Sequence, residues 1–212
     1  MLSNLTELNV SFNSLTALPE ELGSLNRLTS LNIASNKLEK LPDSIGRLSS
    51  LTQLHARGNQ LRALPEAIVT LAGLTHLDVS WNKLTCLPKR VGEMCALQAL
   101  HLGNNQIKEL PSPALSGLTC LKELSIPNNQ LTDLPLSELL EIANTLTFID
   151  VDKNPFTDPR LADGDFVCQW IHGRSTLFWP SNCCCSINGA LFLLSHHDRY
   201  RPFQPYRRCS QR

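Results

Sequence analysis

Histidine and aspartate recur at a fixed spacing in the middle of the sequence. His55, Asp78 and His101 are each 23 residues apart, and His76 precedes Asp78 by two positions. If these residues lie in one row on neighbouring strands about 4.8 Å apart, Asp78 could accept a hydrogen bond from either flanking imidazole. A solvated, hydrogen-bonded row in a binding surface is the leading interpretation. A pH-sensitive contact, a zinc site and a catalytic His/Asp pair are the alternatives.

These histidines do not predict an enzyme. No serine or cysteine nucleophile is paired with them, and a flat sheet offers no pocket that excludes water. Glycine-rich phosphate loops, the H-E-x-x-H motif and paired catalytic carboxylates at useful spacing are absent from the sequence. We therefore predict no catalytic residue, no metal ligand and no cofactor.

Arg57 and Trp81 are the strongest candidates for contact with a partner. Arginine and tryptophan are enriched among binding hot spots because each combines a large contact area with a polar group. Two alternatives stay open, since Arg57 could be an ordinary solvated charge and Trp81 could pack over the rim of its own repeat.

A repeat along the chain determines where these side chains lie. In its first unit the pattern L-x-x-L-x-[LIV]-x-x-N-x-L-x-x-L-P runs from Leu5 to Pro19. The alternating leucines predict a short strand, and the Leu-Pro step predicts a short helical or extended return. The asparagine of each unit is expected to bond backbone groups of neighbouring units. These asparagines are spaced by 23 residues four times, then by 24 and 25: Asn13, Asn36, Asn59, Asn82, Asn105, Asn129 and Asn154.

The pattern resembles the leucine-rich-repeat family over roughly residues 2–156. Its L-P-x-x-[LI]-G-x-L half is similar to the intracellular Ras-suppressor and scribble-type subgroup. The expected fold class is an α/β repeat solenoid, a curved horseshoe with a parallel sheet on its concave face and short helical or extended segments on its convex face. We expect about six repeats and a degenerate seventh in a domain of residues 1–159.

The predicted partner-binding surface consists of side chains that point outward from the strands or lie at their ends. The set combines the histidine row, the two hot-spot candidates and outward polar residues of the other strands. Its members are Glu7, Asn9, Asn32, His55, Arg57, His76, Asp78, Trp81, His101, Glu123 and Asp150.

Residues 160–212 form a predicted second region, a poorly ordered tail rich in cysteine and arginine. The whole chain has 19 basic and 19 acidic residues, but the tail holds 7 basic and 3 acidic ones. A membrane-surface segment at Ile187–Leu194 is one alternative, with Arg199, Arg201, Arg207 and Arg208 as its basic flank. Another is a zinc site, although three adjacent cysteines do not reproduce a C-x2-C knuckle. Its candidate ligands are Cys183, Cys184, Cys185, His196, His197 and Cys209.

The sequence predicts a cytoplasmic adaptor or scaffold that binds a signalling protein on its concave sheet. We expect no secretory signal after Met1, no transmembrane segment, reduced cysteines and no nucleic-acid partner. The family resemblance implies a small GTPase or a phosphatase subunit as the partner. Because Met1 falls just before the first strand, we expect either a fragmentary product or an open end that docks on a partner. The alternative functions are the recognition arm of a kinase, GTPase or ubiquitin ligase, and an immune-type receptor.

Overall fold

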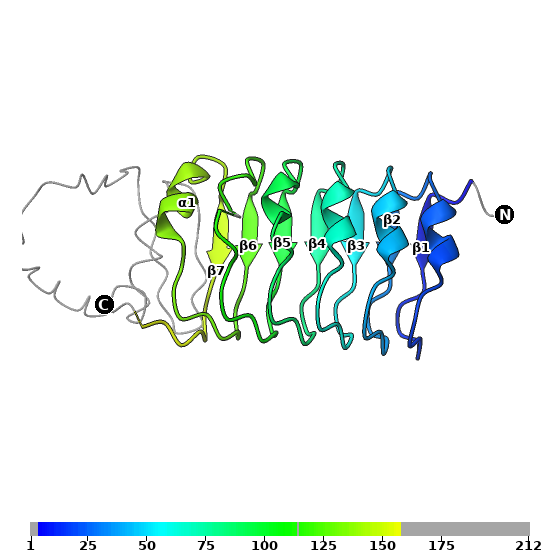
Figure 1. Ribbon diagram of the computed structural model, residues 1–212, viewed down its shortest axis with the longest axis horizontal. Coiled ribbons are helices and arrows are strands. Elements are labelled where there is room, and N and C mark those ends of the chain that lie inside the picture. The colour runs from blue at the N-terminus through cyan, green and yellow to red at the C-terminus, as the bar shows by residue number, and fades with distance from the viewer. Residues whose placement is uncertain (1–3, 114, 158–212) are drawn as a thin grey trace, which may run out of the picture.

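The computed structural model describes residues 4–113 and 115–157, which wind into one coil per repeat (Figure 1). Each coil contributes one short strand to a single parallel sheet whose strands follow the order of the chain. We number the coils after these strands. The strands are β1 (Glu7–Asn9), β2 (Ser30–Asn32), β3 (Gln53–His55), β4 (His76–Asp78), β5 (Ala99–His101), β6 (Glu123–Ser125) and β7 (Phe148–Asp150). The predicted curved repeat solenoid is confirmed.

Neighbouring strands pair without any slip in register. Leu8 lies beside Leu31, Leu31 beside Leu54, and the same pairing continues to Ile149 in β7. The register is fixed because the middle residue of each strand points into the core and a slip by one residue would turn it toward solvent. As a result, outward side chains of successive strands stand in straight rows across the sheet.

Short helices cover the side opposite the sheet, where Figure 1 shows them as a row in front of the strands. All five follow a Leu-Pro step, four of them directly and η4 two residues later, because proline fixes φ near the helical value and needs no N–H partner. The Leu-Pro prediction is therefore confirmed. The helices are η1 (Glu20–Ser24), η2 (Asp43–Arg47), η3 (Glu66–Thr70), η4 (Val91–Glu93) and α1 (Leu136–Glu141).

Two contacts hold the helices together from coil to coil. The Glu20 carboxylate accepts the Ser44 N–H at 3.1 Å, so the first residue of η1 satisfies a free donor at the start of η2. A methyl group at Gly46 would lie 2.4 Å from the Ala67 carbonyl oxygen, so only glycine permits η2 and η3 to approach this closely.

The core is a stack of leucine layers that is complete from coil 2 onward. Leu28, Leu31 and Ile33 are fully buried in coil 2, whereas Leu8 and Val10 in coil 1 are only partly buried. Coil 1 has a neighbouring coil on one side only within the described residues, so its leucine layer is partly open, as expected from the sequence.

The asparagine ladder connects the coils on the inside, as the sequence predicts. The Asn82 side-chain oxygen accepts the Leu61 N–H, and its amide donates to the carbonyl oxygens of Ala56 and Val79. The same arrangement recurs at Asn36, Asn59, Asn105, Asn129 and Asn154. Each amide therefore pairs backbone groups that the turn would otherwise leave buried without a partner.

The predicted tail at 160–212, with its zinc and membrane-surface alternatives, lies outside the described residues. Within the described ranges, no helix has the length and apolar composition needed to cross a bilayer.

Candidate partner-binding surface

The sheet brings the eleven predicted site residues onto one face or to its edge. The register places Asn9, Asn32, His55, Asp78, His101 and Asp150 in a single row that runs from β1 to β7. Glu7, His76 and Glu123 stand in the adjacent row. Arg57 and Trp81 follow β3 and β4, at the ends of their strands. Glu7 and Asp150 are on the two outermost strands, so a single small ligand would not contact both.

Asp78 does not bond the neighbouring imidazoles, and this part of the prediction is wrong. Its Oδ1 atom instead accepts the backbone N–H of Ser80 at 3.0 Å and the Ser80 hydroxyl at 2.6 Å. An aspartate bonds readily to the backbone two residues later, and that local bond requires no ordering of a side chain on another strand. The carboxylate therefore stabilises the turn that follows β4.

The asparagine and aspartate residues of the row make the same turn. Asn9 accepts the N–H of Ser11 at 3.0 Å, and Asn32 accepts the N–H of Ala34 at 3.1 Å. Asp150 accepts the N–H of Asp152 at 3.1 Å. Burial raises the pKa of Asp150 above its ordinary value, although the Asp152 N–H acts in the opposite direction. The Oδ1 atom of each of these residues already has a backbone partner, which gives these side chains a structural role beside any contact with a ligand.

His101 has an acidic neighbour that the sequence analysis did not pair with it. Its Nε2 atom lies 3.5 Å from Oε2 of Glu123, one strand over and one row across. Both side chains are 40% or more exposed, so the pair is solvated and contributes little to stability. To predict a diagonal pair of this kind, the register of the two strands must be known. The sequence gives that register only after its repeats have been aligned.

His76 has a hydroxyl within hydrogen-bond distance. The His76 Nδ1 atom lies 2.8 Å from the Thr75 hydroxyl, and that hydroxyl also lies 2.9 Å from the Thr52 carbonyl oxygen. The single hydroxyl proton serves one of these two groups at a time, and when the carbonyl accepts it, Nδ1 must donate to the hydroxyl oxygen. The Thr75 hydroxyl is therefore shared between the imidazole and a bond to the neighbouring coil.

Arg57 and Trp81 lie together. The guanidinium carbon of Arg57 is 5.7 Å from the centroid of the Trp81 ring, within the range of a cation–π contact. Trp81 is 53% exposed, so it does not pack fully over the rim of its coil. In the described residues Arg57 forms no ion pair with a carboxylate. Its charge is thus available to a partner.

The third residue after each strand has a backbone conformation that the sequence analysis missed. Seven equivalent positions have φ between 54° and 68°, the left-handed region that glycine and asparagine tolerate best. Gly58 and two asparagines supply a signal for this conformation, but Phe12 and Trp81 do not fit it. Phe12 is also 84% exposed. The seven positions are Phe12, Ser35, Gly58, Trp81, Asn104, Asn128 and Lys153.

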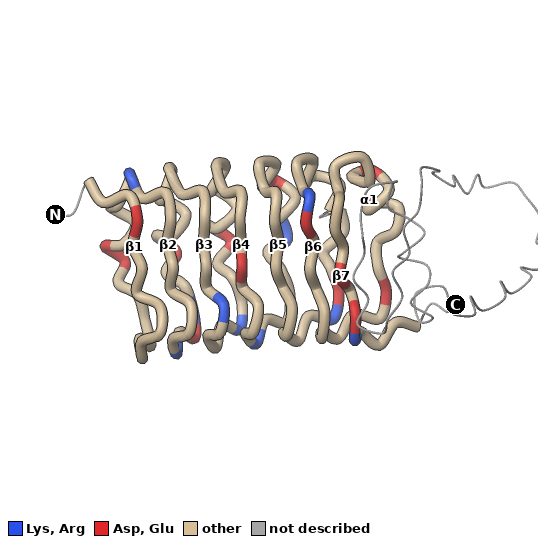
Figure 2. Tube along the Cα trace, turned by 180° about the vertical axis from the view of Figure 1, so that it is seen from behind, with Lys and Arg blue, Asp and Glu red and all other residues tan. Residues whose placement is uncertain are grey.

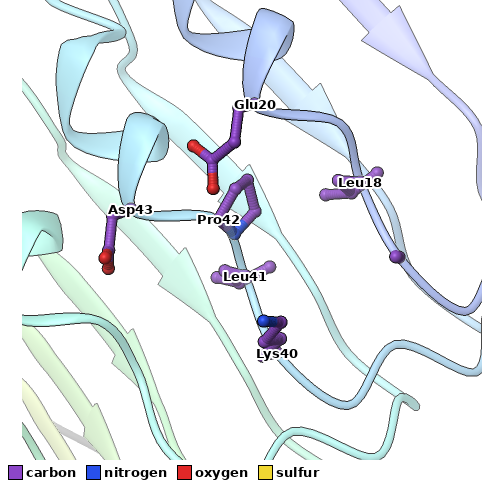
Figure 3. A pocket seen from close by; sticks show the side chains of 7 residues that line it. Leu18, Glu20, Lys40, Leu41, Pro42 and Asp43 are labelled. Atoms are coloured by element: carbon purple, nitrogen blue, oxygen red, sulfur yellow. The ribbon is translucent and has the colours of Figure 1, made fainter.

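Other places for chemistry are few in the part of the chain that the structure describes. Among these residues no three His, Cys, Asp or Glu side chains gather as metal ligands would. A pocket of about 230 Å³ lies between coils 1 and 2, away from the histidines (Figure 3). Glu20, one of its polar groups, is already bonded to Ser44. Its lining residues are Ala17, Leu18, Glu20, Lys40, Leu41, Pro42 and Asp43.

Solved structures with the same architecture are numerous. A leucine-rich-repeat protein of Leptospira interrogans is 34% identical, with a TM-score of 0.68, over 72% of this chain and 38% of its own. Another is the ectodomain of the Arabidopsis thaliana membrane receptor kinase GASSHO1/SCHENGEN3, which was solved with Casparian strip integrity factor 2. It is 34% identical, with a TM-score of 0.66, over 72% of this chain and 19% of its own. An internalin of Listeria monocytogenes shares the fold. It is 23% identical, with a TM-score of 0.68, over 83% of this chain and 50% of its own. The chain spans half or less of the length of these solved chains.

Comparison of the sequence with known families identifies the repeat. Leucine rich repeat matches residues 3–61 and 74–85, and Leucine Rich repeats (2 copies) matches residues 95–141. None of the curated proteins matches the sequence significantly. The matched segments include the strands of coils 1 to 6, and the period, the asparagine ladder and the parallel sheet agree with them. The chain belongs to the leucine-rich-repeat family.

Proposed function

We propose that this chain is a protein-interaction module, and not an enzyme, that binds a partner domain across the face of the seven-stranded sheet. The observation that carries the proposal is the Arg57–Trp81 pair, an exposed aromatic ring with an uncompensated cation beside it. Side chains of these two types dominate the binding energy of many interfaces. The receptor ectodomain solved with Casparian strip integrity factor 2 supports the proposal, since it shares the repeat at 34% identity.

The size of the face suits a small protein domain. Seven strands about 4.8 Å apart, each about five residues long at about 3.3 Å per residue, give a footprint of roughly 550 Å². That area lies below the roughly 800 Å² per partner of a standard interface, so we expect moderate affinity. The mixed charges of the rows do not favour nucleic acid.

The finer role that we propose is an adaptor or scaffold in cytoplasmic signalling, of the Ras-suppressor and scribble type. A small GTPase or a phosphatase subunit is the proposed partner. Cys86, Cys95 and Cys120 are exposed and free, which is typical of a reducing compartment. A second candidate is the recognition arm of a larger enzyme or immune-type receptor. It is favoured by the short span of this chain relative to the solved chains, 19% in the case of the receptor kinase ectodomain.

Photo-crosslinking from defined positions tests the sheet as the binding surface. A benzoylphenylalanine at His101, on the sheet, is compared in cells with one at exposed Arg47 on η2, on the opposite side. We expect a discrete crosslinked partner from His101 and none from Arg47. Equal products from both positions, or a product from Arg47 alone, would remove the sheet from consideration.

A further inference from the structure

Beyond the sheet face, the turns that follow β1 to β4 form a second exposed surface, here called the basic edge and defined as residues 11–17, 34–40, 57–63 and 80–86. It carries five basic side chains against one acidic one, although the surrounding domain has an acidic excess. Figure 2 shows these basic positions gathered at the lower ends of β2, β3 and β4. The basic residues are Lys37, Lys40, Arg57, Arg62 and Lys83, and the acidic one is Glu39.

The cations of the basic edge are not neutralised within the described part of the chain. All five are exposed, and none forms an ion pair with a carboxylate there. Lys83 donates to the Gln60 side chain at 3.1 Å, a neutral partner that positions the ammonium group without cancelling its charge. Arg57 lies over Trp81. A cluster of uncompensated cations attracts an acidic ligand and increases its rate of association.

Two aromatic side chains on the same edge are held in an unfavourable backbone conformation. Phe12 has φ of 55° and Trp81 has φ of 57°, in the region where Gly58 at the equivalent position of coil 3 has no steric cost. Phe12 is 84% exposed, so packing within the chain does not account for its presence. Backbone strain of this kind persists at sites of function. Phe12 and Trp81 are three coils apart, about 14 Å, and the small residues Ser35 and Gly58 lie between them.

We propose that the basic edge binds an acidic segment of a protein partner, with apolar side chains of that segment on Phe12 and Trp81 and its carboxylates on Arg57 and Lys83. This proposal names the chemistry of the partner and rests on the proposed interaction function. Single-stranded nucleic acid would also suit cations beside aromatic rings. The spacing of the two rings favours a protein, because adjacent bases of a strand could not stack on both Phe12 and Trp81 about 14 Å apart.

Selection of random displayed peptides on the full-length chain tests the proposal. We expect the selected peptides to be enriched in Asp and Glu beside Leu, Phe or Trp, and to bind less tightly as salt is raised. Arg57→Glu with Lys83→Glu should weaken them by at least about tenfold. The matched control Arg47→Glu with Lys89→Glu makes the same change in net charge away from the edge and should weaken them little. Phe12→Gly should weaken them without lowering the melting temperature.

The outcomes separate the edge from the sheet. Gln53→Glu adds one negative charge at the opposite end of β3, on the sheet. Peptides weakened by Gln53→Glu but not by the edge variant would overturn the basic edge and remove Arg57 as an anchor, and they would leave the outward rows of the sheet as the binding surface of the proposed function. Peptides indifferent to both changes would overturn both proposals. Binding of a single-stranded DNA at physiological salt that the edge variant abolishes, with no acidic peptides selected, would replace the protein partner with nucleic acid.

Discussion

The side-chain oxygen of Asn82 accepts the backbone N–H of Leu61 at 3.0 Å, across the joint between two coils. Asn82→Ala would leave that donor buried without a partner, whereas the Ala56 carbonyl would keep its bond from the Asn59 amide. We expect the free energy of unfolding to fall by about 2 kcal/mol, measured by urea denaturation. Asn13→Ala is the matched control, because Asn13 is exposed and bonds only carbonyls of its own coil. A loss at Asn13 as large as that at Asn82 would show that bonds between coils are not the cause.

Glu138 of α1 is a buried acid with a structural task. It is 6% exposed, and its two carboxylate oxygens accept the Ser112 hydroxyl at 2.7 Å and the Leu115 N–H at 2.8 Å. Glu138→Leu should destabilise the domain by about 2–3 kcal/mol, because a buried N–H then lacks an acceptor. Hydrogen exchange should become faster at Leu115 before it does in β1 to β4. Exposed Glu141→Leu, on the same helix, should leave both measurements nearly unchanged.

Asp150 makes stability depend on pH in an unusual direction for a carboxyl group. Burial raises its pKa in the folded state, so the folded protein binds a proton more readily than the unfolded chain. Its contribution is fully present below the ordinary pKa of 3.8 and is lost as pH rises through the folded pKa. Asp150→Asn should therefore raise the melting temperature at pH 7, with the gain disappearing in acid.

The asparagine at position 150 would keep the turn, since Asn9 and Asn32 make the same bond at the equivalent positions of coils 1 and 2. Exposed Glu109→Gln changes the net charge equally and serves as the control. A melting temperature at pH 7 that is unchanged or lower in Asp150→Asn would contradict the effect of burial.

Phe12 and Gly58 occupy equivalent left-handed positions with opposite consequences for substitution. Gly58→Val should cost about 2 kcal/mol, because a β-branched residue is disfavoured at φ of 68° and its Cβ would lie 3.4 Å from the Ser35 hydroxyl. Phe12→Gly should stabilise the domain by up to about 1 kcal/mol, less the small contact of its ring. Chemical denaturation of both variants checks the pair. A loss of stability in Phe12→Gly would mean that the ring packs usefully within the chain.

The fold could be predicted from the sequence because each sequence repeat corresponds to one coil of the structure. The spacing of Asn36, Asn59 and Asn82 determines the coil length, and the coil length determines which residues share a row. The prediction for Asp78 was wrong because a local bond to Ser80 competes with any bond across strands, and a row of residues does not reveal which one forms. The left-handed backbone at Phe12 was missed because residue type carries no signal there.

The sequence predicted where the candidate site lies, but it did not predict which of its side chains contact one another. Arg57 and Trp81 were identified separately, but their cation–π contact requires the side chain of coil 3 to reach over that of coil 4. The Glu138 bonds escaped notice for a related reason. They join residues 26 and 23 positions apart, and the described residues between β5 and β6 include no helix like those of the other coils.

The exact register of coils 1 to 5 makes them interchangeable parts. Because Asn13, Asn36, Asn59, Asn82 and Asn105 are evenly spaced by 23 residues, excising residues 36–58 would join Ser35 to Asn59 and recreate an existing joint. Each remaining strand would keep a neighbour of the same shape, while the sheet would shorten by about 4.8 Å. Duplication of one coil would lengthen it by the same step. The reach of the binding face can therefore evolve in whole-coil increments, independently of the side chains that each strand presents.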